Sequence, residues 1–133
     1  MSPVFLDTVG LIAVWDETDQ WHSGAAPVYS RLLRERRVLV TTSYVLAECA
    51  NASARRIFRG AVIELQESLE LFGWLIFPGE EDWRRASRAY AAGSSGGPGL
   101  VDHLSFAVIR RSGLHEVFTN DRHFRAAGFE PLS

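Results

Sequence analysis

Four acidic residues occupy comparable positions along this chain of 133 residues. Each stands where a predicted strand ends or in the early turns of the helix that follows: Asp7, Glu48, Asp102 and Asp121. Taken singly, each acid has an ordinary structural explanation, such as capping a helix N-terminus. Four carboxylates brought together would repel one another unless a cation lay between them. Because Mg²⁺ and Mn²⁺ prefer carboxylate oxygens, the pattern predicts a divalent-metal site.

Glu48 is the acid whose position is least typical of an exposed residue. It lies within the apolar run "YVLAECA", and buried carboxylates are rare without a partner. Asn51 follows about one turn later on the same face of the predicted helix. We therefore expect Glu48 and Asn51 to form a polar notch in an otherwise buried helix.

Alternating strands and helices would bring these residues together. Short apolar runs predict strands at Val4–Asp7, Val38–Thr41, Trp74–Phe77 and Glu116–Thr119, with a fifth at Phe129–Leu132. Helical patterns are predicted at Gly10–Asp16, His22–Glu35, Ser43–Ala54, Arg56–Phe72, Glu80–Tyr90 and Leu100–Arg111. This order predicts an α/β fold with helices on both faces of a central, mostly parallel sheet of four or five strands. Ligands bind such sheets at the carboxyl ends of the strands, where Asp7 and Asp121 emerge.

The composition restricts the possible functions. The length fits one domain, expected over residues 1–133, and the formal net charge of -2 excludes a general basic field for nucleic acid. All 14 basic residues are arginine, so no catalytic lysine is available. The single cysteine, Cys49, excludes an internal disulfide and favours a reducing compartment. With no signal peptide and no apolar run of roughly 18 residues, we expect a cytoplasmic protein without membrane contact.

Histidine and tryptophan residues have structural interpretations that we favour. His103 adjoins Asp102, but no cysteine pair or HxxxH spacing accompanies it, so a structural role is favoured over zinc binding. The same holds for His22. We expect the four tryptophans to pack in the core or at an interface rather than form a base-stacking platform: Trp15, Trp21, Trp74 and Trp83.

The order and spacing of four short motifs resemble PIN-domain proteins, specifically the VapC toxins of type II toxin-antitoxin systems. These motifs are "FLDT", "VLAE", "VDHLSFAVIRRSG" and "FTNDRHFRAAGFEPL", and together they extend over nearly the whole chain. The resemblance implies a PIN-like three-layer α/β/α sandwich. It places the family's acidic site on the four acids named above and its polar pair, which helps hold the metal-bound water or the scissile phosphate, on Thr119 and Asn120. Val9 departs from the polar residue that many relatives carry near the first aspartate.

The resemblance also implies an activity and partners. The activity is that of an endoribonuclease dependent on Mg²⁺ or Mn²⁺, which leaves 5'-phosphate and 3'-hydroxyl ends on its RNA substrate. A VapB-like antitoxin would inhibit the enzyme, and the toxin would be a homodimer. The helices near Trp15–Leu33 and Ile57–Phe72 are candidates to line the antitoxin groove. Arginines near the acids are candidates for phosphate contacts: Arg122, Arg125 and Arg55, with Arg56 and Arg59 beside the last.

Two other functions remain open at this point. One is a PIN fold that only binds RNA or a partner, although the presence of all four acids favours catalysis. The other is a receiver-like or dehalogenase-like phosphotransfer domain. Such domains also place an aspartate after a parallel strand. Phosphotransfer is disfavoured because "DTVGL" has no second aspartate two positions after Asp7 and the chain has no lysine to clamp a phosphate.

Overall fold

The computed structural model describes residues 1–52 and 59–133. Within these residues, five strands form one sheet in which every neighbouring pair is parallel. The strands are β1 (Val4–Leu6), β2 (Leu39–Thr42), β3 (Leu75–Ile76), β4 (Glu116–Phe118) and β5 (Glu130–Leu132). Their order across the sheet is β3-β2-β1-β4-β5. The predicted α/β class is confirmed, and the mostly parallel sheet is parallel throughout.

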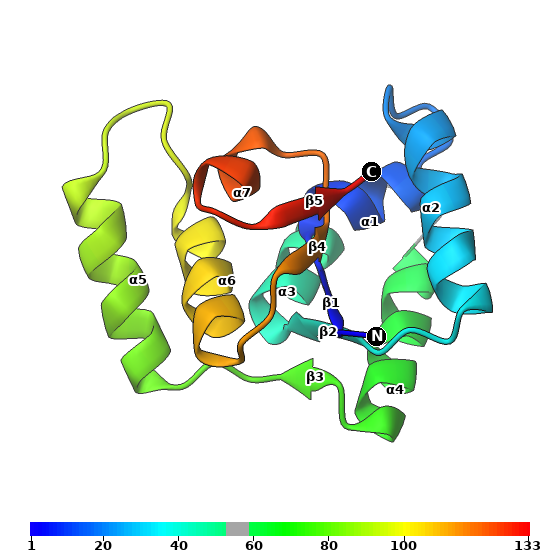
Figure 1. The fold of residues 1–133 in the computed structure, drawn as a ribbon, viewed down its shortest axis with the longest axis horizontal. Coiled ribbons are helices and arrows are strands. Elements are labelled where there is room, and N and C mark those ends of the chain that lie inside the picture. Colours follow the sequence, from blue (N-terminus) through cyan, green and yellow to red (C-terminus); the bar gives the residue numbers. More distant parts are fainter. Residues whose placement is uncertain (53–58) are drawn as a thin grey trace.

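Helices cover both faces of this sheet, as the sandwich architecture requires. They are α1 (Thr8–Trp15), α2 (His22–Arg34), α3 (Ser43–Ala52), α4 (Arg59–Phe72), α5 (Glu80–Ala92), α6 (Leu100–Arg111) and α7 (Arg122–Ala126). Figure 1 shows α5 and α6 on one side of the strands and α2 and α4 on the other. None of the helices in residues 1–52 and 59–133 is both long and apolar enough to cross a membrane.

The central strand β1 is buried on both faces, since Val4, Phe5 and Leu6 have no exposed surface. It lies between β2 and β4, and its register with β4 pairs Leu6 with Phe118. The next residue of each strand, Asp7 and Thr119, therefore emerges at the same edge. Two polar residues far apart in sequence are thus adjacent at the carboxyl ends of the central strands.

Gly10 lets α1 pack directly onto the end of β4. A Cβ atom at this position would lie 2.4 Å from the Phe118 carbonyl oxygen, closer than any real contact. Glycine is required here because the backbone of one element touches that of another. The close packing fixes the first turn of α1, and with it Asp7 and Thr8, above the sheet edge.

Most described boundaries lie within one or two residues of the predictions, and two differences bear on the site. Helix α1 begins at Thr8, two residues before the predicted start, so Asp7 is its N-cap. Helix α7, from Arg122 to Ala126, was not predicted because five residues are too few to show a helical period. The predicted end of the third helix at Ala54 and start of the fourth at Arg56 lie outside the described residues.

Candidate metal and catalytic site

Asp7 is buried at the carboxyl end of β1, with 2% of its surface exposed. Its side chain makes no capping hydrogen bond to α1. Instead, Asp7 Oδ2 accepts a hydrogen bond of 2.7 Å from the Thr119 hydroxyl. The pKa of Asp7 is raised to about 7, mainly because the carboxyl group is buried; hydrogen bonds from the Thr119 hydroxyl and the Thr8 backbone oppose this increase, and the negative charges of Asp102 and Asp121 contribute to it. The carboxylate therefore faces the other acids rather than serving as a helix cap.

Glu48 reaches the same region from α3. The Thr8 hydroxyl donates a hydrogen bond of 2.6 Å to Glu48 Oε1, which links α3 to the first turn of α1. Burial raises the pKa of Glu48, and the charge of Asp102 adds to the effect. Asn51, the partner expected from helical spacing, is exposed. The polar notch around Glu48 is therefore completed by Thr8, a residue on a different helix.

Asp102 lies in the first turn of α6, and one of its oxygens has a capping function. Asp102 Oδ2 accepts a hydrogen bond of 3.1 Å from the Gly99 backbone N–H. Burial raises the pKa of Asp102, the Gly99 N–H opposes this effect, and the charge of Asp121 contributes to the increase. The capping interpretation is thus correct for this acid, but it does not exclude a second role for the half-buried carboxylate.

Asp121 is the N-cap of α7, because its Oδ1 accepts a hydrogen bond of 2.9 Å from the His123 backbone N–H. Its own N–H donates to the Thr119 hydroxyl oxygen at 3.0 Å. The Thr119 hydroxyl thus accepts from Asp121 and donates to Asp7. One buried side chain sets the positions of two of the four acids.

The structure brings all four predicted acids to one edge of the sheet. The charge of Asp102 acts on Asp7 and on Glu48, and the charge of Asp121 acts on Asp7 and on Asp102. Asp102 and Asp121 each have a carboxylate oxygen within 4.8 Å of the other and of a ring nitrogen of His123. This oxygen-rich set suits a hard divalent cation such as Mg²⁺ or Mn²⁺.

His123 was not singled out in the sequence. Its Nε2 lies 3.1 Å from the Gly96 carbonyl oxygen, and its Nδ1 lies 2.9 Å from Asp121 Oδ1. The ring therefore connects the glycine-rich loop before α6 to the turn that carries Asp121. Its only sequence signal is its place in "NDRHF", two residues after an acid.

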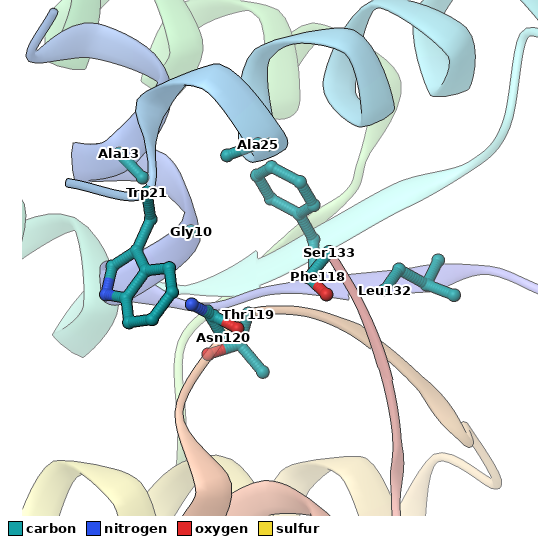
Figure 2. A pocket seen from close by; sticks show the side chains of 10 residues that line it. Gly10, Ala13, Trp21, Ala25, Phe118, Thr119, Asn120, Leu132 and Ser133 are labelled. Carbon is teal, nitrogen blue, oxygen red and sulfur yellow. The ribbon is translucent and has the colours of Figure 1, made fainter. Parts of the chain in front are cut away.

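Thr119 and Asn120 also line a pocket of about 290 Å³ beside the acids. The other walls come from α1, α2 and the last strands, and include Gly10, Trp21 and Phe118. Figure 2 shows the Trp21 indole and the Asn120 side chain directed toward one another at one end of this pocket. Both members of the predicted polar pair therefore line the pocket, and Thr119 also makes hydrogen bonds with Asp7 and Asp121.

Of the predicted phosphate contacts, Arg122 and Arg125 lie on the helix that Asp121 caps. Arg122 and Arg125 are exposed on α7, and Arg59 is exposed at the start of α4. Arg55 and Arg56 lie outside the described residues. The two histidines predicted to be structural both contact the protein: His22 Nδ1 lies 2.8 Å from the Ala13 carbonyl oxygen, and the ring of His103 packs edge-on against Phe106.

Comparisons with known proteins agree with this architecture. The model of the PIN domain family matches residues 4–130. The fold is similar to that of VapC20 of Mycobacterium tuberculosis, described as a sarcin-ricin loop cleaving toxin, with a TM-score of 0.77, 25% identity and 95% of each chain covered. It is also similar to FitAB bound to an IR36 DNA fragment, with a TM-score of 0.68, 18% identity, and 97% of this chain and 93% of that chain covered.

A third similar structure is FitAcB of Neisseria gonorrhoeae, with a TM-score of 0.64, 19% identity, and 98% of this chain and 96% of that chain covered. No curated protein matches the chain significantly in sequence. The expected PIN fold and the similarity to a VapC toxin are confirmed. Since the family model extends over nearly all of its residues, the chain belongs to the PIN domain family.

Proposed function

We propose that this protein is a metal-dependent endoribonuclease and the toxin of a VapBC-like type II toxin-antitoxin pair. The observation that carries the proposal is the convergence of Asp7, Glu48, Asp102 and Asp121 at one edge of a PIN-family sheet. PIN domains are generally nucleases, and VapC20, which shares this fold, cleaves the sarcin-ricin loop. Four buried or half-buried acids have no comparable use in a module that only binds a partner.

The donor set supports Mg²⁺ or Mn²⁺ as the cofactor. Asp7 is nearly fully buried with two other acids acting on it, so its anionic form requires a compensating cation. Asp7 and Asp102 would hold the ion, and Glu48 and Asp121 would complete the site directly or through water molecules. Such an ion lowers the pKa of a coordinated water and neutralises charge that develops on the phosphate during hydrolysis.

The side chains around the acids hold them in place before substrate binds. Each carboxylate accepts a hydrogen bond at one of its two oxygens: Asp7 from Thr119, Glu48 from Thr8, Asp102 from Gly99 and Asp121 from His123. Such supporting hydrogen bonds fix ligand orientation and are worth roughly 10- to 100-fold in metal affinity or activity. The site is therefore preorganised by two donors in helices, Thr8 and His123, by the N-cap Gly99 of α6 and by Thr119 after the end of β4.

RNA would approach this edge through local contacts, since the net charge of -2 gives no general attraction. Arg122 and Arg125 are exposed on the helix that Asp121 caps, which places two cations beside the acids. We assign them, and Arg55 by its sequence position, to phosphate contacts. These contacts would hold the RNA backbone, while the acids act on one phosphodiester bond.

The proposed antitoxin would bind a separate groove between α2 and α4. This groove has a volume of about 350 Å³, and its walls include Trp15, Tyr29, Leu65 and Trp74. Two residues at this groove are exposed although they are apolar, Leu33 at 54% and Phe72 at 60%. An amphipathic segment of a partner would cover such a surface. We also propose that the protein forms the homodimer that its family resemblance implies.

The deciding experiment is cleavage of single-stranded RNA by the wild type and by Asp102→Asn, with Mg²⁺, Mn²⁺ or EDTA. We expect cleavage only by the wild type with metal, and products with 5'-phosphate and 3'-hydroxyl ends. Undiminished activity in EDTA, or cyclic phosphate ends, would contradict the mechanism. Binding without cleavage would support the non-catalytic alternative. Transfer of a phosphoryl group from acetyl phosphate to Asp7, detected by mass, would support the phosphotransfer alternative.

A further inference from the structure

The pocket beside the acids has the dimensions of a site for one small aromatic group. Its volume of about 290 Å³ is at the lower end of the range for small-molecule sites, roughly 300–1,000 Å³. Its walls are largely apolar and include Gly10, Ala13, Ala25 and Leu132. Its size and apolar lining suit one planar group better than a folded element or a stretch of several nucleotides. It accommodates a single planar group.

Trp21 gives this pocket an available aromatic surface. Its side chain lies at the pocket and the residue is 48% exposed, so the indole is not part of the core. The Trp21 backbone is fixed by an N–H that donates to Asp19 Oδ1 at 2.8 Å. The sequence favoured core or interface packing for this residue, and the core interpretation is wrong for Trp21. An exposed indole on a fixed backbone can stack a planar ligand at little cost in conformational entropy.

Asn120 supplies the hydrogen-bonding groups of the pocket. Figure 2 shows its side-chain amide directed toward Trp21. Within residues 1–52 and 59–133, neither this amide nor the Trp21 indole N–H has a hydrogen-bond partner. An amide offers both a donor and an acceptor to the edge of a ligand held against the indole. Stacking combined with hydrogen bonds to an edge is how proteins recognise unpaired RNA bases.

The pocket is continuous with the catalytic edge through Thr119. This residue is part of the pocket wall, and its hydroxyl donates to Asp7 and accepts from Asp121. Asn120 is the next residue in the chain, so the pocket and the acids share one wall. A nucleotide whose base occupied the pocket would have its phosphate close to Asp7.

We propose that the pocket lined by Trp21 and Asn120 binds one RNA base next to the scissile phosphate, with Trp21 stacking on the base and Asn120 contacting its edge. This assignment rests on the proposed ribonuclease function, and it gives that function a source of sequence preference. Trp21 is a substrate-binding residue in this arrangement. The partner groove between α2 and α4 is a different surface, because the two sets of lining residues do not overlap.

The test measures RNA binding separately from cleavage. Asp102→Asn is the background, and Kd for a labelled single-stranded RNA is measured with Mg²⁺ by fluorescence anisotropy, after Trp21→Ala or Trp83→Ala is added. Trp83 is the matched control, since it is a tryptophan of similar exposure, 42%, that packs against Tyr44 instead. We expect Trp21→Ala to weaken binding roughly 5- to 150-fold, the range for loss of one stacked base, and Trp83→Ala to leave binding unchanged.

An abasic nucleotide, moved along the same RNA one position at a time, identifies the base that the pocket holds. At one position, adjacent to the cut made by the wild type, the abasic RNA should bind as weakly as Trp21→Ala does. Combining Trp21→Ala with the abasic RNA should weaken binding no more than either change alone, because both changes remove the same stacking interaction. Asn120→Ala should reduce the discrimination among the four bases at that position while Trp21→Phe retains most of the affinity.

The outcomes separate this proposal from the proposed function. RNA binding without cleavage by the wild type would contradict the enzyme, while the Trp21 and abasic measurements would still test the pocket. The base-binding assignment would be overturned, even in an active nuclease, if Trp21→Ala and the abasic RNA caused additive losses of affinity. Equal RNA affinity of the Trp21→Ala and Trp83→Ala variants would also overturn it. Loss of antitoxin affinity in Trp21→Ala with RNA affinity intact would assign the pocket to the partner. Melting curves of the variants check that each one is folded.

Discussion

The Thr119 hydroxyl donates a 2.7 Å hydrogen bond to Asp7 Oδ2, although 112 positions separate the two residues in sequence. The same hydroxyl accepts from the Asp121 backbone N–H at 3.0 Å. Thr119 is itself 1% exposed, so neither bond competes with solvent. One buried side chain therefore couples the acid after β1 to the acid after β4, and it is the first place to test the site.

Replacing Thr119 by Val should reduce kcat/KM roughly 10- to 100-fold with little change in fold, because valine keeps the shape and removes the hydroxyl. Thr119→Ser should retain most of the activity. The Thr119 hydrogen bond lowers the pKa of Asp7, so its loss should also raise that pKa and move the acidic limb of the pH–rate profile to higher pH. An unchanged pH profile in Thr119→Val would count against this positioning role.

Asp7→Asn should stabilise the metal-free protein at alkaline pH. The pKa of Asp7 is about 7 in the folded protein and 3.8 ordinarily, so the folded chain binds this proton more tightly than the unfolded chain. The associated stability is complete below about pH 4 and is lost as the pH rises through 7. In EDTA, we expect Tm of Asp7→Asn to exceed that of wild type by several degrees at pH 8, on the order of 5 °C, and by less at pH 5. A difference in Tm that does not grow with pH would contradict the burial of an ionisable Asp7.

Adding Mn²⁺ or Mg²⁺ should raise Tm of the wild type, since an ion that binds only the folded state stabilises it. At about 100 times its Kd, the gain is ~2.7 kcal/mol. Asp7→Asn and Asp102→Asn should lose this response. Glu67→Gln, which changes an exposed acid on α4, serves as the control and should retain it. A full response in both site variants would place the ion elsewhere.

Expression of the wild type without its proposed antitoxin should arrest growth, because all four acids of the site are present. Asp102→Asn should relieve the arrest at an equal protein level, as judged by immunoblot. The glutamine variant of Glu67 again provides a control with the same change of charge. Equal arrest by Asp102→Asn would mean that toxicity does not arise from this site.

The proposed antitoxin groove between α2 and α4 can be tested by introducing a negative charge into it. Phe72→Glu places a carboxylate at the groove and should weaken binding of the antitoxin while RNA cleavage is unchanged. Leu71→Glu is the matched control, because Leu71 is the preceding residue of α4, is 81% exposed and is absent from the groove. Calorimetry with the antitoxin's C-terminal peptide gives the two affinities. Similar weakening by both variants would indicate a general charge effect instead of a docking surface.

The shared position of Asp7 and Asp121 at one edge could be predicted from sequence because it follows from sheet topology. Asp7 and Asp121 come just after β1 and β4, and the carboxyl ends of adjacent parallel strands meet at one edge. Contacts between helices could not be predicted in the same way. Helical spacing paired Glu48 with Asn51, whereas the observed donor is Thr8 of another helix. Periodicity describes neighbours within an element, and the packing of α1 against α3 depends on the whole fold.

The exposure of Trp21 could not be predicted from the sequence either. Four tryptophans in a chain of this size are most simply assigned to packing, and Trp15 and Trp74 do pack at the edge of the core. Trp21 and Trp83 do not, at 48% and 42% exposed. His123 was overlooked because the five-residue helix that carries it has no period to detect. Local structure of this kind depends on the cap at Asp121 more than on hydrophobic pattern.

The central position of β1 between β2 and β4 has a consequence for synthesis of the protein. Translation produces Asp7 long before Thr119 and Asp121, yet the three share one hydrogen-bonded cluster. A nascent chain cannot complete the site until β4 has left the ribosome and paired with β1. A ribonuclease built in this way would thus stay inactive while only its first strands have folded on the ribosome.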